Sequence, residues 1–286
     1  MFGLFDAIKD FFKEMLLGII QGNLESMFID INSQVTSVAG YVGKTPQSFN
    51  SEVFSFIRSI NDNVVIPISG LILTAVLCLE LINLVVEKNR MQENSFDFFK
   101  YVFKMAVAVY LVTHAFDFAM ASFDVAQHLV SKAAGVVSTS GVIDANQIAA
   151  MVEALKEKSI AELIGIAFET GLVKLGIQIV SILILVIVYG RMMEIYLYSS
   201  ISAIPFATLG NGEWKGIGTN YIKGLFALAL QGLFLLISLG IYAVIIKSVS
   251  ITDIHKSLFM VLAYTVLLGL MMLKSGTIAK SIMNAH

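Results

Sequence analysis

The sequence predicts an all-α membrane protein, a polytopic bundle of about five transmembrane helices. Hydrophobic residues make up 57% of the 286 residues and charged residues 14%, whereas about a quarter of the residues in a soluble domain are charged. The mean hydropathy is +0.82. Several apolar segments approach about 20 residues, the length at which a helix rising about 1.5 Å per residue crosses a hydrocarbon core of about 30 Å.

Residues 1–62 form the first expected region, which opens with an amphipathic, interfacial helix over residues 2–20. Apolar residues recur on one face of this helix, and the charged residues on the opposite face are too frequent for a membrane span. The apolar positions are Leu4, Phe5, Ile8, Phe11, Phe12, Met15, Leu16 and Ile19. This face can pack on the rest of the protein or lie on the membrane surface, and the sequence leaves both open. A weaker, mixed amphipathic pattern follows, divided by Pro46 before a short helix over 51–59.

Residues 63–123 are expected to form a transmembrane hairpin with spans at 64–86 and 101–123. A loop with several charged residues joins the two spans. Pro67 falls in the first turn of the first span, where a helix tolerates proline.

Ionisable residues inside this hairpin are costly in hydrocarbon, so each should have a partner or a function. Glu80 lies in the first span, and Lys104 of the second span could reach it across the hairpin. His114 and Asp117 lie three residues apart, on one face of the second span. They could form a structural hydrogen-bonded pair, or a proton-relay or lumen-lining pair.

Residues 124–171 are expected to form a helical excursion outside the membrane, because they contain no apolar run of span length. Two capping-box patterns, at 144–147 and 159–162, predict helix starts. The second helix can run into the third span, and if unbroken to residue 202 it has about 43 residues and a length of some 65 Å. Such a helix must project from the bilayer, kink or do both. The available kink sites are Gly171, Gly176 and Gly190.

Residues 172–286 should form a C-terminal membrane region with spans near 172–189, 226–246 and 257–273. Arg191 and Glu194, at the inner end of the third span, have the spacing of an ion pair on one helix. A stripe of residues in the fourth span recurs at helical spacing and should face protein or water. It comprises Ala227, Gln231, Phe234, Ser238 and Tyr242. Its partner is either a neighbouring span of the same chain, or an adjacent subunit or lumen.

The turn at 205–221 joins the third and fourth spans and is the most specific feature of the sequence. Proline cannot continue a helix, and the glycines permit positive backbone dihedrals or close approach of a neighbour. Trp214 and Tyr221 are residue types that favour the headgroup boundary. The turn is either an interfacial belt on a short or re-entrant loop, or a docking surface or pore constriction. The candidate residues are Pro205, Gly210, Gly212, Trp214, Gly216, Gly218 and Tyr221.

The distribution of basic residues predicts the orientation of the chain in a bacterial cell membrane. Lysine and arginine are frequent in the loop of the first hairpin, in the turn at 205–221 and in the C-terminal tail. The positive-inside rule therefore places these segments and the C-terminus in the cytoplasm. The N-terminus and the excursion at 124–171 would lie outside.

The chemistry missing from the sequence argues against an enzyme. A net charge of −2 disfavours a general nucleic-acid-binding surface, and the single Cys78 excludes an intrachain disulfide. The four histidines are scattered, and neither a catalytic motif nor a metal-ligand or cofactor-binding pattern is visible. The remaining alternative to a structural subunit is a small-solute or ion-coupled transporter that uses Glu80, His114 and Asp117, although no inverted repeat supports it.

The order of these elements, together with the segment AIPFATLGNGEWKGIGTNYIKGLFALALQ at 203–231, resembles a known family. It is similar to the TrbL-like, or VirB-six-type, polytopic inner-membrane subunits of type IV secretion and conjugation systems, in the compact form of Gram-positive conjugative elements. The resemblance implies a membrane channel or scaffold subunit that forms a homo-oligomer, such as a pentameric ring. It also implies contacts with secretion ATPases, a bitopic scaffold subunit and pilin-like or tip subunits, and passage of a DNA–relaxase substrate.

Overall fold

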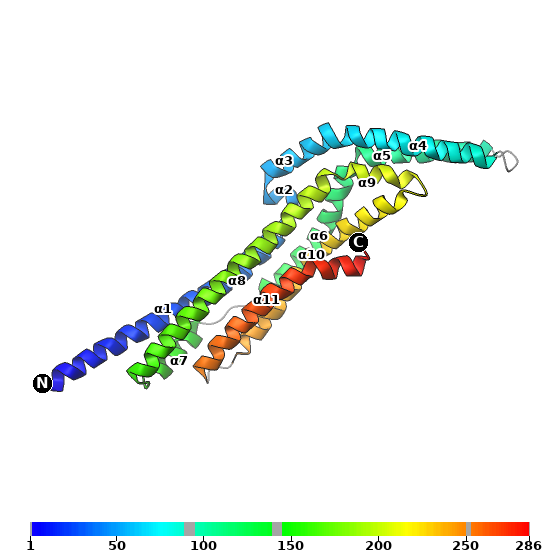
Figure 1. Cartoon of the computed structure of the whole chain (residues 1–286). Coiled ribbons are helices and arrows are strands. Elements are labelled where there is room, and N and C mark those ends of the chain that lie inside the picture. The colour runs from blue at the N-terminus through cyan, green and yellow to red at the C-terminus, as the bar shows by residue number, and fades with distance from the viewer. Residues whose placement is uncertain (1, 89–94, 139–144, 250–252, 286) are drawn as a thin grey trace. The chain divides into compact units, whose positions relative to one another are not determined.

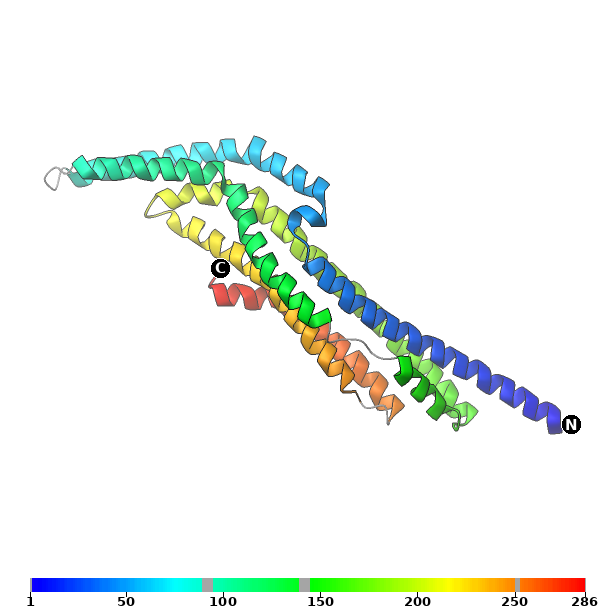
Figure 2. The same cartoon turned by 180° about the vertical axis from the view of Figure 1, so that it is seen from behind.

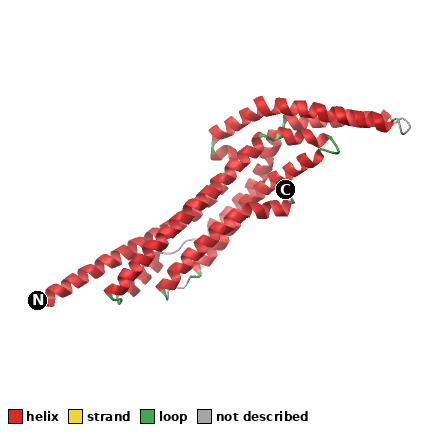
Figure 3. Ribbon diagram, viewed as in Figure 1, coloured by secondary structure: helices red, strands yellow, loops and turns green. Residues whose placement is uncertain are grey.

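The computed structural model describes residues 2–88, 95–138, 145–249 and 253–285 (Figure 1). All regular elements within these ranges are helices (Figure 3), which confirms the all-α prediction. They are α1 (Phe2–Val42), α2 (Pro46–Phe49), α3 (Ser51–Ile60), the π-helical turn η1 (Asn61–Val65), α4 (Ile66–Lys88), α5 (Ser95–Thr113), α6 (Ala115–Ser138), α7 (Ala145–Leu155), α8 (Ile160–Ser200), α9 (Ala203–Ala207), the 3-10 turn η2 (Thr208–Gly210), α10 (Lys215–Lys247) and α11 (Ile254–Met283).

Among the described residues, four continuous helical segments are long and apolar enough to cross a membrane, which confirms a polytopic protein. They are Ser51–Val86, Ile160–Ser200, Lys215–Lys247 and Ile254–Met283. A fifth candidate is a bent pair, Phe98–Thr113 with Ala115–Gly135, whose two helices meet at 68°.

The second span, expected over 101–123, is not one continuous helix, because the helix breaks at His114. At the break, Thr113 Oγ1 donates to the carbonyls of Val109 and Tyr110 at 3.0 and 3.1 Å. The His114 ring nitrogen Nδ1 lies 3.0 Å from the same Tyr110 oxygen. Side chains that bond backbone carbonyls in this way compete with a regular helix.

The first span begins earlier than expected, since the helical segment runs back to Ser51 through the π-helical turn η1. Pro67 is therefore an interior proline, which lacks the N–H that would bond four residues back. The Ile66 N–H bonds to the Asn61 carbonyl, five residues back, directly before this proline. The wider turn thus accommodates the interruption of the helical bonding.

Contacts divide the chain into two compact units, each assembled from three segments. The first unit comprises Met1–Gly43, Ser131–Val188 and Phe234–Lys274. The second comprises Lys44–Val130, Tyr189–Leu233 and Ser275–His286.

In the first unit, α1 is about twice as long as expected because a second apolar stripe continues the helix to Val42. The stripe is buried at Leu16, Ile20, Leu24, Met27, Ile31, Val35, Val38 and Val42. It packs beside α7 and α8, which lie next to α1 in both views (Figures 1 and 2). Tertiary packing of this kind stabilises helices that local propensity alone would leave marginal.

The three residues expected as kink sites do not interrupt α8, which is one helix of 41 residues. Gly176 instead permits close packing, because a Cβ there would lie 2.7 Å from Leu262 Cδ1 of α11. The capping box that opens α8 is confirmed: the Ser159 N–H donates to Glu162 Oε2 at 2.9 Å, and the Glu162 N–H donates to Ser159 Oγ at 3.3 Å. The side chains of the other predicted box, at 144–147, lie outside the described residues.

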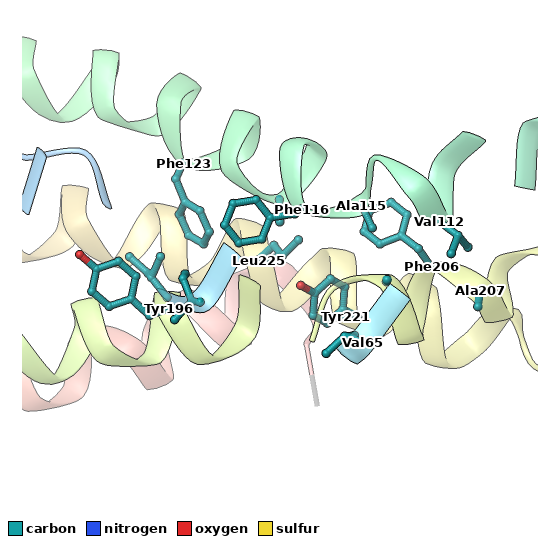
Figure 4. Close-up of a cluster of buried hydrophobic side chains, with 14 of the residues drawn as sticks. Val65, Val112, Ala115, Phe116, Phe123, Tyr196, Phe206, Ala207, Tyr221 and Leu225 are labelled. Carbon is teal, nitrogen blue, oxygen red and sulfur yellow. The ribbon is translucent and has the colours of Figure 1, made fainter. Parts of the chain in front are cut away.

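The core of the second unit gathers side chains from seven α-helices and the π-helical turn η1, around the turn between α8 and α10 (Figure 4). Phe206 of α9 stacks with Phe118 of α6 and meets Tyr221 of α10 edge to face. Val112 and Ala115, on either side of the break between α5 and α6, lie in the same cluster as Val65 of the π-helical turn. Both backbone irregularities of the hairpin therefore contribute to this core.

Candidate functional site

The turn between α8 and α10 is largely buried in the second unit. Its short helices α9 and η2 pack against α4 and α5 of the first hairpin. Pro205, Thr208 and Gly210 are buried. Thr208 Oγ1 donates to the Pro205 carbonyl at 2.7 Å and accepts the Gly218 N–H at 3.1 Å. This part of the turn is a packed wedge whose docking partner is the hairpin of the same chain.

The glycines of the turn differ from one another in their roles. Gly218 permits a close approach as expected, since a Cβ there would lie 2.6 Å from the Pro205 carbonyl oxygen. Gly216 does not, because nothing lies within 4 Å of its Cβ position. The positive dihedrals expected at Gly210 and Gly212 do not occur; no described glycine has a positive φ. The helical and 3-10 turns at 203–210 reverse the chain without them.

The two aromatic residues assigned to the headgroup boundary separate in the structure. Trp214 is 41% exposed, in an exposed tip that extends from Gly212 to Ile217. Tyr221 is buried, so its assignment to an interfacial belt is wrong. Its hydroxyl donates to the Tyr198 carbonyl at 2.7 Å, and its ring stacks on that of Tyr198 at 5.8 Å between centroids. An aromatic ring with one hydroxyl can be buried when that hydroxyl has a partner.

Glu80 joins three elements. Lys104 of α5 pairs with it across the hairpin, as the sequence predicts. Asn211 Nδ2 of the turn donates to the other carboxylate oxygen at 3.4 Å. Asn211 Oδ1 also accepts the N–H groups of Glu213 and Trp214 at 2.8 and 3.2 Å, which caps the start of α10. The sequence reasoning missed Asn211, although an asparagine shortly before a helix start is a known signal.

The ion pair expected between Arg191 and Glu194 is wrong. Arg191 is buried, its Nε donates to the Leu228 carbonyl of α10 at 3.3 Å, and its guanidinium lies against Gly232. Glu194 instead pairs with Lys280 of α11 at 3.3 Å. Two spans far apart in sequence provide these partners, and spacing along one helix does not reveal them.

The stripe of the fourth span makes contacts within the same chain. Ala227 is buried, and Gln231 Nε2 donates to Ser275 Oγ of α11 at 3.4 Å in the second unit. In the first unit, the hydroxyls of Tyr242 and Thr265 lie 2.9 Å apart. Ser238 lines a small groove whose other lining residues are mainly apolar. At these hydrogen bonds the stripe faces α11. A neighbouring span of the same chain is one of the two alternatives that the sequence allows.

His114 and Asp117 make their described polar contacts with other residues. Asp117 pairs with Arg58 at 3.2 Å, and His114 contacts Tyr110 and Thr113 at the helix break. Both are exposed. The described residues also contain no group of three or more histidine, cysteine, aspartate or glutamate side chains that could hold a metal ion.

The second unit therefore combines a buried turn, ion pairs between spans and an exposed tip. Comparison with known families shows that residues 31–203 fit the model described as TrbL/VirB6 plasmid conjugal transfer like protein. The chain belongs to this family. No curated protein and no solved structure matches it.

The TrbL/VirB6-like match covers most of the chain, from within α1 to the first residue of α9. It confirms the predicted family on residues outside the segment 203–231, because that segment meets the matched range only at Ala203. Glu80, His114, Asp117, Arg191 and Glu194 lie inside the matched range. The exposed tip and the stripe of α10 lie beyond it.

Proposed function

We propose that this TrbL/VirB6-like membrane subunit is a channel or scaffold component of a conjugative type IV secretion system, which helps a DNA–protein substrate cross the cell membrane. The family match carries the proposal. The four continuous candidate spans and the bent pair supply a multi-pass membrane body for it.

The exposed apolar surface of the spans supports a role inside a larger assembly. Only 28% of the apolar window of Ser51–Val86, and of that of Ile160–Ser200, is buried within the chain. Lipid or other subunits must cover the rest. We propose that the chain forms a homo-oligomer, such as a pentameric ring, in contact with secretion ATPases, a bitopic scaffold subunit and pilin-like or tip subunits.

The alternative of a small-solute or ion-coupled transporter gains no support from the geometry. Its three candidate residues make their described polar contacts elsewhere: Glu80 with Lys104 and Asn211, Asp117 with Arg58, and His114 with the end of α5. Unchanged transfer in a strain that lacks this subunit would leave this alternative in place of the proposed function.

A donor strain that lacks this subunit tests the proposal. Transfer to recipients should fall to background and return when the intact chain is supplied. Formaldehyde crosslinking followed by precipitation of the tagged subunit should recover the transferring strand, and a donor without relaxase should yield none. Unchanged transfer in the deletion strain would refute the proposed function. Loss of transfer without DNA recovery would leave a scaffold role and reject a conducting role.

A further inference from the structure

The face of α1 that points away from its packed stripe is exposed from Ile8 to Gly40, apart from Ser26, which is half-buried. Over the first half it is apolar: Ile8, Phe12, Met15 and Ile19 are each between 43% and 47% exposed. Over the second half the same face carries mainly small residues. They are Gly22, Ser26, Ser33, Ser37 and Gly40, with Ile29 between them. The hydroxyls of Ser26 and Ser33 donate to carbonyls of α1 itself, which suits them to a contact without water.

A second exposed stripe of side chains, here called the seam, runs along α8. Unlike the face of α1, it begins with small side chains and continues with large ones. The small residues are Ala161 and Gly165, beside the larger Ile164. Large apolar side chains follow, each at least 52% exposed, at Phe168, Leu172, Leu175, Ile179, Ile182 and Val186. The steps alternate between four and three residues, the spacing by which one helix packs along another.

Hydrogen bonds within the first unit fix the relative height of the exposed face of α1 and the seam of α8. Asn23 bonds to Thr170, Asp30 to Gln178 and Gln34 to Ser181, at sequence separations of 147, 148 and 147. A constant separation means that α1 and α8 run parallel, with each residue of α1 level with the residue about 147 positions later. The small half of α1 is thus level with the large seam of α8. Of the large half of α1, Met15 and Ile19 are level with residues 162–166, beside the small seam residue Gly165. Ile8 and Phe12 are level with residues 155–159, before α8 begins.

Lipid does not fit the exposed face of α1. The apolar stretch of α8 starts near Leu172. The apolar half of the α1 face lies at the height of residues before this stretch, and the small, polar half lies at the height of the stretch itself. The polarity is therefore inverted relative to a bilayer. A helix parallel to a span also cannot lie in the membrane plane, as an interfacial helix does. These observations disfavour the membrane-surface interpretation of residues 2–20; the side chains of Leu4 and Phe5 lie outside the described residues.

We propose that the exposed face of α1 in one copy packs on the exposed seam of α8 in the next copy. This inference rests on the proposed function, in which the chain works as a homo-oligomer. If an axis parallel to these helices relates neighbouring copies, each residue keeps its height along the axis from one copy to the next. Small positions on each helix then meet large positions on the other. Two different surfaces in contact form a heterologous interface, which closes into a ring when the rotation permits.

Crosslinking between two differently tagged copies, with Cys78 replaced by serine, tests this contact. Ser33→Cys in one copy should form a disulfide with Ile179→Cys in the other, as should Ile19→Cys with Gly165→Cys. The control pairs Ile19→Cys with Val186→Cys, whose heights differ by about 20 residues or 30 Å. A disulfide needs Cα atoms within about 7 Å, so the matched pairs should give at least about tenfold more mixed-tag dimer.

Three results would overturn the interface. Crosslinks only between identical positions would indicate a two-fold contact. Alkylation of Ser33→Cys by an aqueous reagent without any crosslink would indicate a water-filled lumen. No crosslink and no alkylation, in cells that still transfer DNA, would indicate cover by another protein. Crosslinking is scored independently of transfer, so matched crosslinks in a system whose transfer survives deletion would retain the contact and refute only the proposed function.

Discussion

At the scale of single residues, Gly218 and Gly216 differ in a way that the sequence does not show: Gly218 is closely packed, and Gly216 has open surroundings. Gly218→Ala should destabilise the protein by about 1 to 3 kcal/mol, because the new Cβ would strike the Pro205 carbonyl and Leu209. Gly216→Ala should be neutral or stabilise by up to about 1 kcal/mol, since its surroundings are open and alanine favours a helix. Thermal unfolding in detergent measures both. Equal effects of the two substitutions would contradict the wedge described for the turn.

Arg191 allows a test that separates stability from function. Its guanidinium is buried in a span, where a charge is costly, and its described bond is to a backbone carbonyl. Arg191→Met should therefore leave the unfolding temperature unchanged or raise it. Arg191→Ala should lower that temperature, because the loss of side-chain packing reduces the free energy of unfolding by about 1 to 3 kcal/mol. A destabilised methionine variant would show that the charge itself stabilises the fold. A stable methionine variant that does not transfer DNA would indicate a functional charge.

The polar side chains also show where sequence reasoning succeeds. The pairing of Glu80 with Lys104 could be predicted because one short hairpin joins their helices. The partners of Arg191 and Glu194 could not, because α10 and α11 supply them across long separations. The residue type of Tyr221 predicts a place at the membrane boundary, whereas a single carbonyl acceptor on α8 makes its burial possible.

At the scale of elements, Glu80 joins α4, α5 and the turn, and this predicts a non-additive set of variants. Lys104→Met alone leaves the Glu80 carboxylate with one amide donor. It should lower the free energy of unfolding by about 1 kcal/mol, because the pair is partly exposed and its loss costs less than that of a fully buried pair. Adding Glu80→Gln should recover part of this loss, because the unpaired charge is removed. Unfolding midpoints of the two single variants and the double variant measure the coupling. Simple additivity would mean that the pair contributes nothing.

The existence of the helices followed from composition and periodicity, but their limits did not. The alternation of apolar and polar residues weakens after residue 20, and the packed stripe from Leu16 to Val42 nevertheless continues α1. The sequence predicts Pro67 in the first turn of a span, whereas the helix begins earlier and passes through a π-helical turn just before this proline. At the break at His114, side chains bond the preceding carbonyls, and no hydrophobic pattern reports the break.

At the scale of the whole molecule, the orientation in the membrane remains a prediction from the basic residues. In a background without Cys78, Glu157→Cys in the outer excursion should react with an impermeant maleimide in intact cells. Ser281→Cys near the C-terminus should react only after permeabilisation. Both residues are exposed, so burial does not limit either reaction. The reverse pattern would invert the orientation. Labelling of both sites in intact cells would require an even number of crossings between them.

The unbroken course of α8 has a mechanical consequence. A helix of 41 residues without a joint is about 60 Å long and behaves as a lever. A tilt of about 5° around its first turn would displace its last turn by about 5 Å, close to the pitch of one helical turn. Within the first unit, such a tilt would displace Val188 by about 4 Å, because this residue lies about 42 Å along the helix from Ile160. A partner that pushes on the start of α8 would therefore shift every α8 side chain that packs on α1, and by more the farther it lies from that start.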